Sequence, residues 1–155
     1  MIDIALFQPD IPQNAGAILR LGACFGATVH IVHPAGFVLS DRNLKRAGMD
    51  YVELAALREH DDFAAFERWR REAGRRLVAL TTHGRESLPD FAFTADDILL
   101  LGRESAGLPS DVRDRVDRLL RLPIRPATRS LNVANAASIS LFEALRQTGG
   151  LPASS

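Results

Sequence analysis

The residues from 98 to 109 read Ile98-Leu99-Leu100-Leu101-Gly102-Arg103-Glu104-Ser105-Ala106-Gly107-Leu108-Pro109. The first four form a continuous apolar run, which is typical of a strand covered by helices on both faces in a parallel sheet. A second apolar run spans Leu77 to Thr81. These two segments predict the central strands of an α/β domain.

Strands and helices alternate on both sides of these two runs. Further strands are predicted at Ile2 to Phe7, Val29 to Val32, near Tyr51 to Leu54, and at Leu119 to Ile124. Helices are predicted over Gln13 to Phe25, from Asp61 or Asp62 to Gly74, over Pro109 to Val116, and over Asn132 to Gln147. This alternation predicts one α/β domain over residues 1–150, with a mostly parallel sheet and helices on both faces, followed by a loose tail at residues 151–155.

Composition limits the class of protein. The chain has 155 residues, 46% of them hydrophobic, which suits one domain with one core. No apolar run reaches the ~20 residues needed to cross a bilayer, and no signal peptide is evident, so we expect a cytoplasmic protein. The only cysteine, Cys24, lies in an apolar stretch and is predicted to be buried, without a disulfide. The four histidines lack the spacing of a zinc site, so we expect no metal.

The charge pattern must be considered locally, because 19 basic residues balance 19 acidic ones. A stretch without acidic residues carries Arg118, Arg121, Arg125 and Arg129. It is a candidate phosphate-binding strip, and a solvated strand edge is an equally good interpretation. A second basic group, predicted on a short helix after Ser40-Asp41, consists of Arg42, Lys45 and Arg46.

Ligands of open α/β sheets bind beyond the carboxyl ends of the strands, so the loops there are the candidate sites. After the first strand, Asn14 and Arg20 are the polar residues of a small, apolar segment. From spacing alone, the simpler interpretation is that Asn14 caps the helix and Arg20 lies on its exposed face.

The loop after Leu101 contains Gly102, Glu104 and Gly107. Its glycines would let a flat ligand lie against exposed backbone N–H and C=O groups. The loop lacks the lysine of a P-loop and the G-x-G-x-x-G of a dinucleotide fold. A plain turn is the alternative, although it leaves Glu104, just beyond a buried strand, without a reason.

The third segment begins the closing helix. Ser130 is a possible helix cap, and the narrow first turns carry Asn132, Asn135, Ala136 and Ala137. Small residues allow the edge of a ligand, or a symmetry-related copy of the chain, to approach closely. Tight internal packing would explain the alanines equally well.

Taken together, the three segments resemble the SPOUT superfamily of RNA methyltransferases. The matching motifs are an early asparagine and arginine, a glycine-glutamate-glycine-leucine-proline loop, and a serine-leucine-asparagine helix start, here at Asn14, Arg20, residues 102–109 and residues 130–132. The match runs from the first strand to residue 147. It is most similar to the minimal tRNA (cytidine/uridine) 2′-O-methyltransferases that modify the wobble nucleotide of leucine tRNAs, a subgroup that residues 44–51 also resemble.

The resemblance implies a deep C-terminal trefoil knot and a homodimer that acts on tRNA. It implies that S-adenosylmethionine is bound by Leu80, Gly102, Leu122 and Ser130, with Leu131 and Asn135 nearby. It assigns Arg20 to orienting the phosphate and the 2′-oxygen of the acceptor ribose, and Asn14 to shaping the acceptor site. Glu104 and Gly107 would anchor the knot loop. Candidates for RNA contact are Arg42, Lys45, Arg46, Arg121, Arg125 and Arg129.

Two positions depart from the family pattern: Phe142 replaces a tyrosine and His83 replaces a lysine. Both lie outside the cofactor motifs, so they bear on the choice of RNA. Methylation of a different RNA and a non-catalytic knotted RNA-binding module are therefore alternatives. A flavodoxin-like regulator or small hydrolase would explain the alternating pattern, but the chain has no G-x-S-x-G nucleophile elbow.

Overall fold

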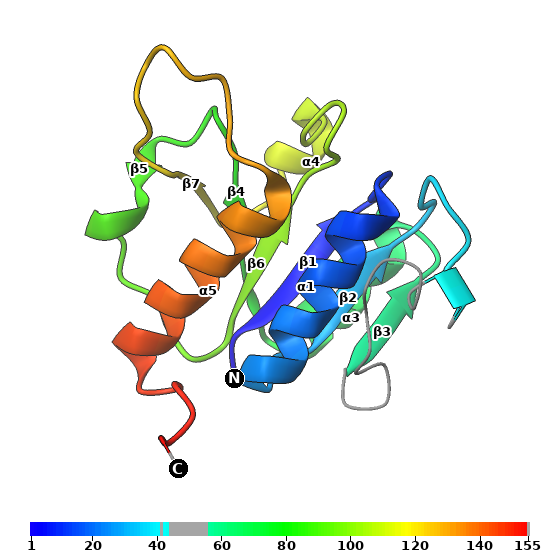
Figure 1. The fold of residues 1–155 in the computed structure, drawn as a ribbon, viewed down its shortest axis with the longest axis horizontal. Helices are drawn as coiled ribbons and strands as arrows, with labels where there is room; N and C mark the ends of the chain where they lie inside the picture. The colour runs from blue at the N-terminus through cyan, green and yellow to red at the C-terminus, as the bar shows by residue number, and fades with distance from the viewer. Residues whose placement is uncertain (41, 44–55, 155) are drawn as a thin grey trace.

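The computed structural model describes residues 1–40, 42–43 and 56–154. Among these residues seven strands form one sheet in the order β3-β2-β1-β6-β4-β7-β5 (Figure 1). The strands are β1 Asp3–Phe7, β2 Val29–Val32, β3 Leu57–His60, β4 Arg76–Leu80, β5 Glu86–Ser87, β6 Asp97–Leu101 and β7 Arg118–Arg121, and all neighbouring pairs are parallel. The helices are α1 Pro12–Phe25, α3 Phe63–Glu72, α4 Ser110–Arg113 and α5 Val133–Thr148, with a 3₁₀ turn, η2, at Leu88–Asp90.

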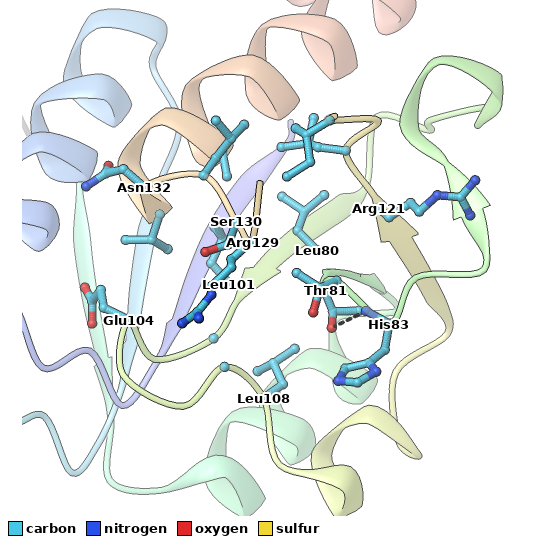
Figure 2. A pocket seen from close by; sticks show the side chains of 18 of the residues that line it. Leu80, Thr81, His83, Leu101, Glu104, Leu108, Arg121, Arg129, Ser130 and Asn132 are labelled. Carbon is cyan, nitrogen blue, oxygen red and sulfur yellow. Dashed lines mark hydrogen bonds between the residues drawn. The ribbon is translucent and has the colours of Figure 1, made fainter. Parts of the chain in front are cut away.

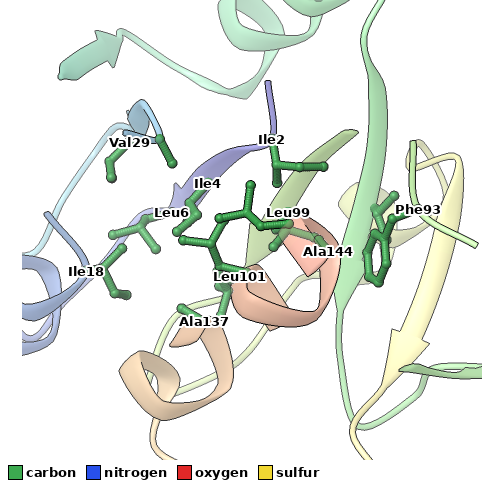
Figure 3. Close-up of a cluster of buried hydrophobic side chains, with 14 of the residues drawn as sticks. Ile2, Ile4, Leu6, Ile18, Val29, Phe93, Leu99, Leu101, Ala137 and Ala144 are labelled. Atoms are coloured by element: carbon green, nitrogen blue, oxygen red, sulfur yellow. The ribbon is translucent and has the colours of Figure 1, made fainter. Parts of the chain in front are cut away.

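Helices cover both faces of this sheet, as the sequence predicts. Alternate residues of each central strand point to opposite faces. In β1, Ile4 and Leu6 join the core beneath α1 and α5 (Figure 3), whereas Ala5 and Phe7 join the core beneath α3 and α4. Because both faces are covered, β1, β4 and β6 consist almost entirely of apolar residues, and the prediction that β4 and β6 are central is confirmed.

Other details differ from the sequence-based predictions. The edge strand β3 was not predicted, because its first three residues are exposed and lack an apolar pattern. β7 ends at Arg121, three residues before the predicted end of that strand. Cys24 is exposed, not buried, since the buried residues of α1, among them Ile18, Leu19 and Gly22, lie on another face of the helix. The strand predicted near Tyr51 to Leu54 lies outside the described residues.

The link from β4 to β5 crosses over β7, because β7 lies between these two strands in the sheet although it comes later in the chain. The N–H of Thr81 donates to the carbonyl of Leu120 at 2.9 Å, and the N–H of Arg85 donates to Leu119 at 3.2 Å. Between them, a Cβ placed on Gly84 would lie 2.2 Å from the carbonyl carbon of Leu120. Only glycine lets the two backbones approach so closely.

None of the helices in the part of the chain that the structure describes has the length and apolar character needed to span a membrane.

We expect Gly84→Ala to lower the free energy of unfolding by ~3 kcal/mol, because the added methyl group overlaps backbone atoms that cannot turn away. Gly74→Ala is the matched control: no atom lies within 4 Å of its added Cβ, and only its φ of +66° is unfavourable. That control should cost ~1 kcal/mol. Urea denaturation measures both values, and equal losses would contradict a close crossing at Gly84.

Candidate functional site

A cavity of about 650 Å³ opens at the carboxyl ends of β4, β6 and β7, where a parallel sheet is expected to bind ligands (Figure 2). Leu80 and Leu101 are the last residues of β4 and β6, and Leu122 follows β7 directly. The start of α5 closes another side. The cavity therefore lies where the three segments singled out in the sequence meet.

Most of the predicted site residues line this cavity. They are Asn14, Leu80, Gly102, Glu104, Gly107, Arg121, Leu122, Arg125, Arg129, Ser130 and Leu131. Asn135 is exposed in the first turns of α5 and lies outside the lining, although its neighbour Ala136 belongs to it. Arg20 is exposed on α1, also outside the lining, and Arg42 is exposed in a short helical segment. Lys45 and Arg46 lie outside the described residues.

The glycine loop after β6 folds back on itself. Arg103 and Gly107 exchange two backbone hydrogen bonds, of 3.2 and 2.8 Å. Gly107 has a φ of +66°, and a Cβ on Gly102 would lie 2.4 Å from the carbonyl carbon of Gly107. Side chains at these two positions would strain or block the loop, so the backbone itself forms this wall of the cavity.

A chain of polar side chains joins the three segments. Glu104 accepts a hydrogen bond from the backbone N–H of Asp10 at 3.0 Å and one from the amide of Asn14 at 3.5 Å. The amide of Asn132 donates to Asn14 at 3.0 Å, and its own oxygen accepts from the N–H groups of Ala134 and Asn135. Asn14 therefore links the loop to α5, and the simpler interpretation as a helix cap is wrong: α1 begins two residues earlier. Asn132 caps α5 instead of Ser130.

Asp10 and Glu104, at one end of this series of hydrogen bonds, both have shifted pKa values. Burial, followed by the neighbouring Asp10, raises the pKa of Glu104 above its ordinary value. Hydrogen bonds from Glu104 and then Ser105 lower the pKa of Asp10 to about 2. Negative charge is therefore concentrated on Asp10, while Glu104 retains its proton to a higher pH than an ordinary glutamate.

The remaining charge around the cavity is positive. Five arginines line it, namely Arg103, Arg113, Arg121, Arg125 and Arg129, against one acidic residue, Glu104. Arg103 and Arg113 were not predicted, because each lies beside an acidic residue in the sequence, Glu104 and Asp114 respectively. Within the described residues, no group of three or more His, Cys, Asp or Glu side chains could hold a metal ion. The cavity thus combines apolar and backbone walls with arginine side chains, which suits a flat ligand beside a polyanion.

Comparison with known proteins agrees with this geometry. Residues 1–142 match the model of the SpoU rRNA Methylase family. A relative from Beijerinckia indica, named tRNA (cytidine(34)-2′-O)-methyltransferase, is 55% identical over 96% of this chain and 92% of its own. A relative from Escherichia coli K12 with the same name is 40% identical, over 96% and 95% of the two chains.

Solved structures are similar over the same length. One, described as giving structural insights into the 2-OH methylation of C/U34 on tRNA, has a TM-score of 0.89 and 44% identity, covering 95% of both chains. The SpoU methyltransferase AviRb from Streptomyces viridochromogenes, in complex with the cofactor AdoMet, has a TM-score of 0.83 and 30% identity over 95% of this chain and 57% of its own. On this evidence the chain belongs to the SpoU rRNA Methylase family.

Proposed function

We propose that the protein transfers a methyl group from S-adenosylmethionine to the ribose 2′-hydroxyl of the cytidine or uridine at position 34 of a tRNA. The observation that carries the proposal is the cavity at the strand ends, which is lined by a backbone wall, five arginines, Asn14 and Glu104. The names of the relatives that are 55% and 40% identical support this substrate. We expect leucine tRNAs as substrates and the cytoplasm as the compartment.

The residues present fit the cofactor. Leu80, Leu122 and Leu131 offer apolar surface for an adenine and a methionine chain, and the loop from Gly102 to Gly107 leaves no side chain in their way. Ser130 adds a hydroxyl at the cavity wall. When bound, S-adenosylmethionine supplies an electrophilic methyl group on a sulfonium. The AdoMet complex of AviRb supports this assignment.

The chain's own part in the reaction is chiefly positional, because the acceptor oxygen must lie in line with the methyl carbon and the sulfur. Asn14 is fixed between Glu104 and Asn132, so it can define the edge of the acceptor site. The guanidinium of Arg20 is a donor-only group and a poor base, so we assign it to holding the phosphate and 2′-oxygen of the acceptor.

We further propose that the C-terminal part of the chain is knotted. The link between β4 and β5 passes over β7, and the chain continues from β7 through residues 122–132 into α5, which packs beside α1 (Figure 1). A strand that passes beneath an earlier loop is the arrangement that a trefoil knot requires. Threading of this kind would fix the cavity walls to one another.

A homodimer is also part of the proposal. Arg20 lies outside the cavity lining of its own protomer, which suits a site completed by a second one. On α5, Ile139 and Phe142 are 47% and 49% exposed, and they adjoin a groove with Leu88 and Pro89. Exposed apolar side chains gathered in this way are typical of an interface. Ala137 is fully buried within the protomer, so its small size serves internal packing.

The reaction is tested by incubating the protein with S-adenosylmethionine and unmodified tRNA, followed by digestion and mass spectrometry. We expect new 2′-O-methylcytidine or 2′-O-methyluridine, and a loss of at least 100-fold in rate for Arg20→Ala. Arg68→Ala, an exposed arginine of α3, is the control. Binding of cofactor and tRNA without methylation would favour another RNA substrate, and then a non-catalytic module.

Cofactor binding should depend on Gly102. In Gly102→Ala the new methyl group overlaps the backbone of Gly107, so the loop cannot close and the affinity for S-adenosylhomocysteine should fall at least tenfold, about 1.4 kcal/mol. Ser110→Ala, at the exposed start of α4, provides the control. Isothermal titration calorimetry measures both, and unchanged affinity in Gly102→Ala would place the cofactor elsewhere.

The dimer is tested by placing a charge on the exposed face of α5. Ile139→Arg should convert dimer to monomer in sedimentation velocity, because an arginine in an apolar interface remains unpaired. Val38→Arg, at a position that is 72% exposed, should leave the dimer intact. A wild-type monomer, or a dimer that tolerates Ile139→Arg, would exclude this face.

A further inference from the structure

Arg103 lines the cavity, and its backbone is held in place by hydrogen bonds. It follows Gly102, whose surroundings admit no side chain, and it exchanges two backbone hydrogen bonds with Gly107. The next residue, Glu104, is bonded to Asn14 on α1. Arg103 therefore belongs to the proposed cofactor loop and directly precedes the residue that bonds this loop to the proposed acceptor side.

The guanidinium of Arg103 is only loosely held within the protein. Its nearest carboxylate oxygen is Oδ2 of Asp10, 3.7 Å from Nη2, and that oxygen already accepts a hydrogen bond from Ser105. The Nε of Arg103 and the Oδ1 of Asp10 are both buried without a hydrogen-bond partner. Asp10 thus keeps the arginine nearby, while at 3.7 Å it does not hydrogen-bond the terminal Nη2.

Arginines with a structural role in this protein are bonded quite differently. Arg70 donates to Glu67 at 2.7 and 3.0 Å and to Asp117 at 2.9 Å. Arg76 makes a two-pronged pair with Asp97 at 2.6 and 2.7 Å. Arg103 has no contact of this quality, and its side chain is 35% exposed. The comparison indicates that its donors are kept for a ligand.

We propose that Arg103 binds a phosphate of the RNA beside the nucleotide that receives the methyl group. The planar guanidinium matches two oxygens of a phosphate, and its terminal N–H groups have no close hydrogen-bond acceptor in the described part of the chain. The cofactor carboxylate offers similar oxygen chemistry, but Arg103 directly precedes Glu104, which bonds to Asn14 on the acceptor side, and its nearest carboxylate is that of Asp10, just before α1. The inference rests on the proposed function and adds a substrate-binding residue to it.

The test compares RNA and cofactor binding by the full-length protein. For Arg103→Ala, we expect the Kd for unmodified tRNA in a filter-binding assay to rise about tenfold. The slope of log Kd against log salt should fall by about 0.7, the value for one phosphate contact on a single strand. The Kd for S-adenosylhomocysteine should stay unchanged. Arg103→Lys, which keeps the charge but not the planar fork, should give an intermediate value.

Arg115→Ala removes an exposed arginine that does not line the cavity, so it should match the wild type in every measurement. If Arg103→Ala weakens cofactor binding and spares tRNA binding, the ligand is the cofactor carboxylate and the proposal is wrong. Unchanged affinities, or a loss of both with a lower Tm, would also overturn it. Failure of the proposed function would show differently, as a wild-type protein that does not methylate tRNA.

Discussion

The contact on which the structure depends is the crossing of two backbones at Gly84 and Leu120. A Cβ at Gly84 would lie 2.2 Å from the carbonyl carbon of Leu120, and hydrogen bonds from Thr81 and Arg85 fix the crossing on either side. The crossing holds the end of β4 against β7, so Leu80 and Leu122 can form adjoining walls of one cavity. The crossing thus continues the pairing of β4 with β7, which ends at Leu80 and Leu120, into the wall of the cavity.

The other walls are joined by side chains. Glu104, Asn14 and Asn132 come from segments that lie as far as 118 residues apart in the sequence, yet they form one hydrogen-bonded chain. Asn132 also caps α5, so the same residue that ends this chain stabilises the helix. A helix cap contributes typically ~1 kcal/mol, and the link from the cap to the glycine loop makes the site and the fold interdependent.

Pattern and spacing were enough to predict the layers of the fold and the edge of the sheet that carries the site. Long apolar runs identify β4 and β6, because strands buried on both faces need apolar residues at nearly every position. The edge strand β3 escapes such a prediction, since Leu57, Arg58 and Glu59 are exposed. Buried histidines escape it too: His60 stacks on His30 at 5.3 Å, and burial lowers its pKa to about 4. Local spacing predicts neither β3 nor the contact between His30 and His60, because both depend on the pairing of strands that are distant in the sequence.

The charge balance explains why a chain with zero net charge can have a cationic site. Several acidic side chains outside the cavity are paired with nearby arginines: Asp3 pairs with Arg75, Asp97 with Arg76, and Glu67 with Arg70 and Arg71. Arg118 and Arg146 are held in the same way by Glu86 and Glu143. Of the basic strip that the sequence suggested, Arg118 is therefore paired with Glu86 and does not line the cavity, whereas Arg121 does. Since paired charges cancel at short range, the field at the cavity is set by the arginines left around it. Recognition of a polyanion then requires no net positive charge, only an excess of arginines over carboxylates around the cavity itself.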